Sequence, residues 1–185
     1  MPSNDPHVAL RRNVEIKARL RDLEQARTLA AELSGGTPQV LRQTDTYFRC
    51  AVGRLKLRQF SDAVAELIAY ARPNDVSPRA SQYRIVPVAD GESLREALSM
   101  SLGVLVVVAK DREVSHYKNV RIHLDRVEQL GTFLEFEAVL ESAAHQSEGE
   151  ALVRELTSRF GLLPADLIAE SYSDMVLHSI SQPPK

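Results

Sequence analysis

The feature that most restricts the fold of this chain is a two-residue alternation of charged and apolar side chains. Successive side chains of a β-strand point to opposite faces, so the alternation predicts strands with two different faces. Between residues 13 and 20, Asn13, Glu15, Lys17 and Arg19 share one face, and apolar side chains share the other. The pattern recurs in residues 54–58, 66–72, 82–86, 104–112, 119–125 and 133–138.

Between these segments lie stretches with the spacing of amphipathic helices. We expect helices at residues 22–33, 91–102 and 146–160, and a shorter one at 171–180. The 185 residues suit one globular domain. We therefore predict an α+β fold with a single domain of residues 11–180, a polar N-terminal tail of residues 1–10 and a C-terminal tail of residues 181–185.

The charged faces of the seven predicted strands allow two interpretations. In an antiparallel sheet, a charged face is usually solvated while the apolar face packs on a core. Seven such faces instead favour a closed antiparallel β-barrel, with helices packed on its apolar outside and a polar tunnel within. A charged interior is costly to desolvate without partners, so a tunnel of this kind predicts a ligand.

The charges assigned to the interior indicate what that ligand is. Cations outnumber acids there, which suits a polyanion, and the acids would repel a polyanion unless hard divalent ions bridged the two. We therefore expect a polyphosphate together with Mg²⁺ or Mn²⁺. The inward residues are Glu15, Lys17, Lys56, Arg58, Arg72, Arg84, Lys110, Arg112, Arg121, Asp125, Glu135 and Glu137.

Several short motifs occur in an order that resembles a known family. Residues 13–17 match a Glu-x-Glu-x-Lys motif in which Asn13 replaces the first acid. Further matches are Lys56-Leu57-Arg58, residues 65–73, Lys110-Asp111-Arg112 and Glu135-Phe136-Glu137. Over residues 13–177 the chain resembles the CYTH domain proteins, or triphosphate tunnel metalloenzymes. Residues 119–125 followed by 130–135 are most similar to the class IV adenylyl cyclase branch.

The resemblance implies a role for each matching residue. Glu15, Glu135 and Glu137 would be metal ligands, and Asp125 would lie near the metal or orient a cation. Lys17, Lys110 and Arg112 would be catalytic as well as phosphate-binding. The full set of implied phosphate-binding residues is Lys17, Lys56, Arg58, Arg72, Arg84, Lys110, Arg112 and Arg121. Asn13 offers a carbonyl oxygen without a charge, so we expect weaker metal binding or an altered metal position.

Three functions are compatible with such a tunnel. In a cyclase-like enzyme the ribose 3′-hydroxyl of ATP attacks the α-phosphorus and releases pyrophosphate. In a triphosphatase, water attacks the terminal phosphorus of inorganic triphosphate, thiamine triphosphate or a nucleotide. A non-catalytic module would hold polyphosphate without turnover. The resemblance favours the cyclase-like reaction and implies a homodimer.

Other classes of function are disfavoured. His123 is expected to hydrogen-bond rather than bind metal, and no histidine pair has zinc-ligand spacing. A net charge of −2 gives no general attraction to nucleic acid or anionic membranes, so neither is an expected partner. Cys50 is the only cysteine, and no apolar run approaches the roughly 20 residues of a membrane span. We expect a cytoplasmic protein.

Overall fold

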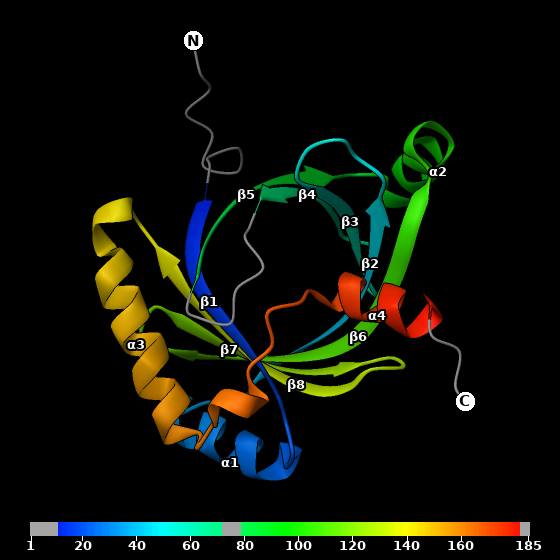
Figure 1. The fold of residues 1–185 in the computed structure, drawn as a ribbon. Coiled ribbons are helices and arrows are strands. Elements are labelled where there is room, and N and C mark those ends of the chain that lie inside the picture. Colours follow the sequence, from blue (N-terminus) through cyan, green and yellow to red (C-terminus); the bar gives the residue numbers. More distant parts are fainter. Residues whose placement is uncertain (1–10, 72–78, 182–185) are drawn as a thin grey trace.

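A computed structural model describes residues 11–71 and 79–181 of the chain, and the side chains of residues 11, 79–82 and 143 are left aside. Eight strands in these ranges form a closed antiparallel barrel in the order β1-β5-β4-β3-β2-β6-β7-β8, and β8 pairs with β1 to close it (Figure 1). The strands are β1 Arg11–Arg19, β2 Gln39–Phe48, β3 Arg54–Phe60, β4 Ala65–Ala71, β5 Arg79–Val88, β6 Val104–Tyr117, β7 Val120–Val127 and β8 Gly131–Leu140.

Four α-helices and two short 3₁₀ helices accompany the barrel. They are α1 Leu23–Ser34, α2 Gly91–Leu102, α3 Gln146–Arg159, α4 Tyr172–Ser181, η1 Ala143–His145 and η2 Pro164–Asp166. Aspartates begin two of them, because the carboxylates of Asp22 and Asp90 accept hydrogen bonds from the first-turn amides of Gln25 and Ser93. All four predicted helices and all seven predicted strands are confirmed, whereas β2 is a strand that our sequence analysis did not predict.

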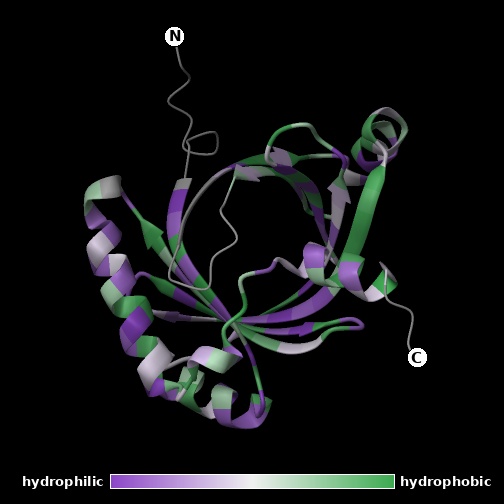
Figure 2. Cartoon of the chain, viewed as in Figure 1, coloured by the Kyte–Doolittle hydropathy of each residue, from purple (hydrophilic) through white to green (hydrophobic). Residues whose placement is uncertain are grey.

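The main hydrophobic core lies outside the barrel. Apolar outward-facing side chains of β1, β7 and β8, including Val14, Ile122 and Phe136, pack against α1 and α3. Contact there is close, since a Cβ added at Gly149 of α3 would come within 2.8 Å of Leu140. A smaller core around Leu57 lies beneath α2. Figure 2 shows hydrophilic and hydrophobic residues alternating along the barrel strands. The charged faces are thereby left to line the interior, as predicted.

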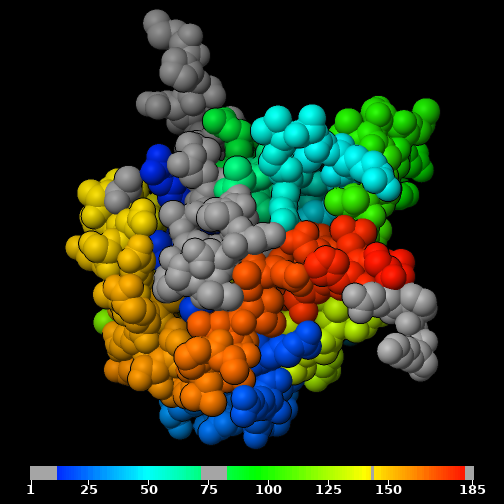
Figure 3. All heavy atoms as spheres, viewed as in Figure 1, coloured from blue at the N-terminus to red at the C-terminus, as the bar shows by residue number. Residues whose placement is uncertain are grey.

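Helix α4 packs differently from the other helices. Its residues Tyr172, Met175 and Val176 contact a cluster at one end of the barrel that includes Tyr47 and Phe133. The rings of Tyr172 and Phe133 meet edge to face, with their centroids 5.0 Å apart. In the space-filling view, α4 (red) and the segment before it (orange) lie on the side of the molecule that faces the viewer (Figure 3). Tyr172 therefore caps this end of the barrel.

The predicted tails fall mainly outside the described residues. Ser181, the first residue assigned to the C-terminal tail, is instead the last residue of α4. Among the described residues, no helix combines the length and the apolar content needed to cross a membrane.

Candidate active site

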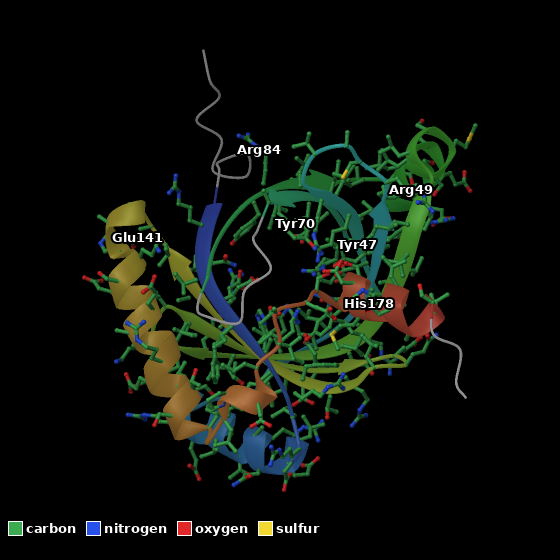
Figure 4. The ribbon with its side chains drawn as sticks, viewed as in Figure 1. Tyr47, Arg49, Tyr70, Arg84, Glu141 and His178 are labelled. Carbon is green, nitrogen blue, oxygen red and sulfur yellow. The ribbon has the colours of Figure 1, made fainter. Side chains whose placement is uncertain are left out.

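The barrel encloses a cavity of about 400 Å³, a volume within the range of small-molecule binding sites. Side chains from every strand of the barrel, together with Ser171 and Tyr172, contribute to its wall. In Figure 4, Tyr47 and Tyr70 lie at the opening of the barrel, whereas Arg49 and Arg84 lie on its periphery. The charged groups of the wall form three connected sets, which we describe in turn.

The first set, the cation cluster, consists of Asp45, Lys56, Arg58 and Lys110 on β2, β3 and β6. Asp45 is fully buried, and its Oδ2 accepts hydrogen bonds from the Nζ atoms of Lys56 and Lys110, both at 2.8 Å. Arg58 donates from Nε to Oδ1 at 2.7 Å and from Nη2 to Oδ2 at 2.9 Å. One carboxylate thus gathers three cations on one wall of the tunnel.

The charges within the cation cluster shift the acidity of its members. Burial acts to raise the pKa of Asp45, but Arg58, Lys110 and Lys56 together hold that pKa well below its ordinary value. Burial and the neighbouring charge of Arg58 lower the pKa of Lys56 to about 7, although Asp45 opposes the shift. Burial also lowers the pKa of Lys110. Lys56 therefore changes its charge near neutral pH.

The second set, the central network, consists of Lys17, Arg112, Asp125, Glu135 and Tyr172. Arg112 binds Asp125 through two hydrogen bonds of 2.6 Å, and the hydroxyl of Tyr172 donates to Asp125 Oδ2 at 2.8 Å. Lys17 Nζ lies 3.6 Å from Glu135 Oε2 and 3.9 Å from the centroid of the Tyr172 ring. Despite the opposing effect of burial, Asp125 raises the pKa of Arg112 well above its ordinary value. Arg112 is therefore a fixed cation.

The third set, the acid cluster, consists of Asn13, Glu15 and Glu137 at the seam between β1 and β8. Glu15 pairs in register with Glu137, and both side chains line the cavity. Asn13 Nδ2 donates to Glu137 Oε1 at 2.7 Å, and Arg121 Nη1 lies 3.3 Å from Glu137 Oε2. Although burial acts to raise it, His123, Arg121 and Asn13 keep the pKa of Glu137 below its ordinary value. Glu137 is therefore a carboxylate at neutral pH.

His123 joins the acid cluster to the central network. Its Nδ1 is 3.1 Å from Glu135 Oε1, and its Nε2 is 3.8 Å from Glu137 Oε2. This agrees with the hydrogen-bonding role expected for His123. Glu135 also lies near Lys17 and Arg112, and although burial opposes it, Arg112 and the other partners hold the pKa of Glu135 well below its ordinary value.

The structure brings together most of the predicted site residues. Of the predicted residues, those that line the cavity are Glu15, Lys17, Lys56, Arg58, Lys110, Arg112, Arg121, Glu135 and Glu137. Asp125 is buried beneath Arg112, with its two oxygens engaged by Arg112 and Tyr172. Its geometry supports the role of orienting a cation, which was one of its two predicted roles.

Two predicted cations are not part of this arrangement. Arg84 is exposed on β5, whereas its neighbours Tyr83 and Ile85 line the cavity. Because neighbouring residues of a strand face opposite sides, Arg84 belongs to the outer surface, and placing it inside was wrong (Figure 4). Arg72 lies outside the described residues.

Sequence reasoning also missed the centre of the cation cluster. Asp45 lies on β2, where Gln43, Asp45 and Tyr47 face the cavity. The signal was an alternation of these residues with Thr44, Thr46 and Phe48. It was weak because Asp45 is the only charged residue on that face.

The acid cluster has donors that suit a hard divalent cation. Glu15 and Glu137 offer carboxylate oxygens, and the Oδ1 atom of Asn13 is buried without a hydrogen-bond partner among the described residues. Carboxylate and amide oxygens are the ligands that Mg²⁺ and Mn²⁺ prefer. In the part of the chain that the structure describes, no three His, Cys, Asp or Glu side chains converge to form a complete metal centre. Glu15, Glu137 and Asn13 could therefore contribute part of a coordination shell.

Comparison with protein families places this tunnel in a known group. The CYTH domain family matches residues 11–172. The chain belongs to the CYTH domain family. No curated protein matches its sequence.

Solved structures share the CYTH fold at low sequence identity. The PH1012 protein of Pyrococcus horikoshii OT3 is 23% identical, with a TM-score of 0.76, over 88% of this chain and 98% of its own. A "putative adenylate cyclase" of Vibrio parahaemolyticus is 17% identical, with a TM-score of 0.75, over 89% of this chain and 97% of its own. A chain of the Schizosaccharomyces pombe Mediator head module is 8% identical, with a TM-score of 0.63, over 85% and 98%. At these identities the likeness shows the fold alone.

Proposed function

We propose that this CYTH protein binds the triphosphate of a small molecule inside the barrel and catalyses a divalent-cation-dependent reaction at one of its phosphorus atoms. CYTH proteins include enzymes that process triphosphates, and these generally use divalent metal ions. The observation that carries the proposal is one cavity with two kinds of wall. The cation cluster lies on β2, β3 and β6, and the acid cluster lies on β1 and β8.

The cations of the wall would bind and orient the phosphates. Lys56, Arg58 and Lys110 already lie within hydrogen-bond distance of a shared carboxylate, so a phosphate oxygen entering the cluster meets preorganised donors. Preorganised cations stabilise the charge that develops on the phosphate oxygens in the transition state. Arg112 is held by Asp125, which also accepts a hydrogen bond from Tyr172, and so supplies a further cation whose direction is fixed.

The acids of the wall would hold the cation. A bound Mg²⁺ or Mn²⁺ would neutralise phosphate charge and polarise a phosphorus–oxygen bond. Glu15 and Glu137 provide the negative charge for it, and Arg121 and His123 keep Glu137 ionised. Without such a cation, these carboxylates would repel the triphosphate that the cation cluster attracts.

Among reactions on this substrate class, we favour the class IV adenylyl cyclase-like one. In it the ribose 3′-oxygen bonds to the α-phosphorus of ATP, the bond from that phosphorus to the β-phosphate bridging oxygen breaks, and pyrophosphate leaves. The motif Asn119–Asp125 followed by Leu130–Glu135 supports this choice through its resemblance to that branch. The family and the fold are equally compatible with hydrolysis at the terminal phosphorus.

A substrate panel tests the proposal directly. Purified protein is incubated with Mg²⁺ or Mn²⁺ and with ATP, inorganic triphosphate or thiamine triphosphate, and cyclic AMP, pyrophosphate and phosphate are quantified. We expect cyclic AMP and pyrophosphate from ATP, with turnover abolished by chelation and strongly reduced in Glu137→Gln. Glu128→Gln, which changes an exposed glutamate outside the cavity, is the matched control.

Each other result of the panel has a defined meaning. Phosphate without cyclic nucleotide would move the protein to the triphosphatases. Triphosphate binding without any product would indicate a non-catalytic polyphosphate-binding module. Turnover that is unaffected by both chelation and Glu137→Gln would contradict the role given to the acid cluster.

A further inference from the structure

The side of the cavity formed by β4 and β5 differs from the sides described above. It lies between them, because β4 pairs with β3 of the cation cluster and β5 pairs with β1 of the acid cluster. Its cavity-lining side chains include Ile68 and Tyr70 of β4 and Tyr83 and Ile85 of β5. We call these four residues the apolar wall. They form two cross-strand pairs, Ile68 with Ile85 and Tyr70 with Tyr83.

Phosphate binding does not explain the apolar wall. The aliphatic side chains of Ile68 and Ile85 offer a phosphate neither a charge nor a hydrogen bond. The apolar faces of β1, β7 and β8 pack against helices outside the barrel, whereas the apolar wall faces the cavity. Pockets for small organic molecules are lined mainly by apolar and aromatic side chains, with a few polar groups among them. The apolar wall therefore indicates a ligand that has an apolar part as well as phosphates.

The apolar wall adjoins the cation cluster directly. Ile68 pairs in register with Lys56, and Lys56 Nζ lies 5.8 Å from the centroid of the Tyr70 ring. Because neighbouring strands are only about 4.8 Å apart, a phosphate bound at Lys56 holds any group attached to it within reach of the apolar wall. Tyr70 lies at the opening of the barrel (Figure 4). The attached group therefore lies between the bound phosphates and that opening.

The two tyrosines indicate the shape of the attached group. Aromatic side chains pack on other rings in offset-stacked or edge-to-face arrangements, and they stack on any nucleic-acid base because every base has a π-face. A positively charged ring is disfavoured here, because the cations Lys56 and Arg58 lie on the strand next to β4. The apolar wall therefore suits a flat ring that carries no charge.

We propose that the apolar wall binds a neutral aromatic ring attached to the triphosphate, so that the substrate is a nucleoside triphosphate and not inorganic triphosphate. The inference rests on the proposed function and specifies its substrate class. Tyr70, Tyr83 and Ile85 are then specificity-determining residues. They contribute to the affinity for the ring, while the cation cluster contributes to the affinity for the phosphates.

Two ligands that resist turnover test this assignment by isothermal titration calorimetry in the presence of Mn²⁺. One is bis(methylene)triphosphate, an inorganic triphosphate whose two bridging oxygens are replaced by methylene groups. The other is the adenosine nucleotide that carries the same bis(methylene) chain, so the two ligands differ in the nucleoside. We expect the nucleotide to bind about tenfold more tightly, the scale for stacking one base on an aromatic side chain.

Neighbouring residues of β5 supply a matched pair of variants. Ile85→Ser places a hydroxyl on the apolar wall, whereas Val86→Ser makes a similar change at a side chain that is 39% exposed on the outer face. Ile85→Ser should lower the affinity for the nucleotide analogue about tenfold and change that for the inorganic analogue by less than about twofold. Val86→Ser should change neither. Tyr83→Ala should act like Ile85→Ser, and Tyr83→Phe, which keeps the ring, should retain the affinity.

The outcomes separate the inference from the proposed function. If neither analogue binds, the proposed function is overturned. If the inorganic analogue binds the wild-type protein as tightly as the nucleotide does, only the inference is overturned. A preference for the nucleotide that persists in folded Ile85→Ser and Tyr83→Ala would exclude the apolar wall as the site of the ring. Thiamine on the same chain, with its cationic ring, should bind more weakly than the nucleotide, and the reverse order would overturn the neutral ring.

Discussion

The cation cluster and the acid cluster occupy opposite sides of one cavity, yet their charges are balanced in different ways. In the cation cluster a single buried carboxylate, Asp45, is surrounded by three basic side chains. In the acid cluster two carboxylates, Glu15 and Glu137, lie opposite each other in register, with a buried amide oxygen of Asn13 beside them. In the first arrangement every carboxylate oxygen is hydrogen-bonded and positive charge is in excess, whereas in the second the Oδ1 atom of Asn13 has no hydrogen-bond partner among the described residues.

The two sides therefore differ in whether their charge is compensated before a ligand binds. The cation cluster can fold without ligand, because Asp45 compensates part of its charge. Under the proposed function, the carboxylates of the acid cluster would repel a triphosphate unless a cation bound beside them. Substitutions on the two sides should therefore differ in the measurement that reveals them, and the following predictions use this difference.

The largest expected effect follows from removing Asp45. Asp45→Asn leaves three cations at a buried site with no carboxylate, and the loss of one partner from a buried ion pair typically costs about 3 to 5 kcal/mol of unfolding free energy. Inorganic triphosphate should restore more stability to this variant than to the wild-type protein, because it replaces the missing negative charge. Urea denaturation with and without triphosphate measures both effects.

Asp111→Asn is the control for this prediction, since Asp111 is an exposed residue of β6. Its effect should remain within about 0.5 kcal/mol. An Asp45→Asn protein as stable as the wild type would show that the cation cluster does not depend on its central acid.

The next largest effect concerns turnover and distinguishes the two clusters. Lys110→Met should lower kcat/KM by roughly 10²- to 10³-fold, the scale for loss of one donor to a transition-state oxyanion. Raising the Mn²⁺ concentration should not recover this loss, whereas it should partly recover Glu137→Gln. Initial rates over a range of Mn²⁺ concentrations make the comparison, with the exposed Lys118→Met as control. If Mn²⁺ restored the activity of Lys110→Met, the separate roles assigned to the two clusters would be contradicted.

A smaller effect is expected from pH, through Lys56. Its pKa in the free protein is about 7, lowered by burial and by Arg58. A bound triphosphate favours the protonated ammonium and raises that pKa, so the affinity should be highest below pH 7 and fall by at most about tenfold per pH unit above it. Lys56→Arg, which stays charged, should lose this component when triphosphate affinity is measured by calorimetry from pH 6 to 9.

The same group predicts the sign of a stability change. The pKa of Lys56 falls from an ordinary value of 10.5 to about 7 on folding, so the unfolded chain binds more protons between these values. The contribution of Lys56 to the free energy of unfolding therefore rises as the pH increases from 7 to 10.5. A slope of opposite sign in the difference between wild type and Lys56→Arg would contradict the assigned pKa shift.

The smallest expected effect tests the register of β5. Arg84→Ala should change kcat/KM by less than about twofold, because Arg84 is exposed while Tyr83 and Ile85 line the cavity. Arg58→Ala, on the inner face of β3, is the contrasting variant. A loss with Arg84→Ala comparable to that with Arg58→Ala would restore the original assignment of Arg84 to the tunnel.

These assignments show what the sequence could and could not predict. The barrel was predictable because polar and apolar residues alternate over residues 13–19 of β1, 120–125 of β7 and 134–138 of β8, and only one face of each can pack beneath α1 and α3. On β5 the alternation is ambiguous, since Tyr83 and Ile85 are apolar yet face inward. A charge at Arg84 was therefore insufficient to decide which face points into the cavity.

Most residues of the site could be predicted, but which of them contact one another could not. The inward positions of Lys56, Arg58 and Lys110 follow from strand alternation, whereas their convergence on Asp45 depends on the order β3-β2-β6 in the barrel. The strands β2 and β3 are consecutive, but β6 is distant from them in the chain, and no local pattern predicts that it lies beside β2. The engagement of Asp125 by Arg112 and Tyr172 was hidden for the same reason, because Tyr172 comes from a helix beyond the last strand.

The seam between β1 and β8 has a consequence for how the protein is made. Asn13 and Glu137 are in hydrogen-bond contact although 124 positions separate them in the chain. A ribosome synthesises β1 first and β8 last, so a nascent chain contains the basic strands long before the complete acid cluster can exist. The acid cluster is therefore complete only at the end of synthesis, when the barrel closes, and partly made chains lack it.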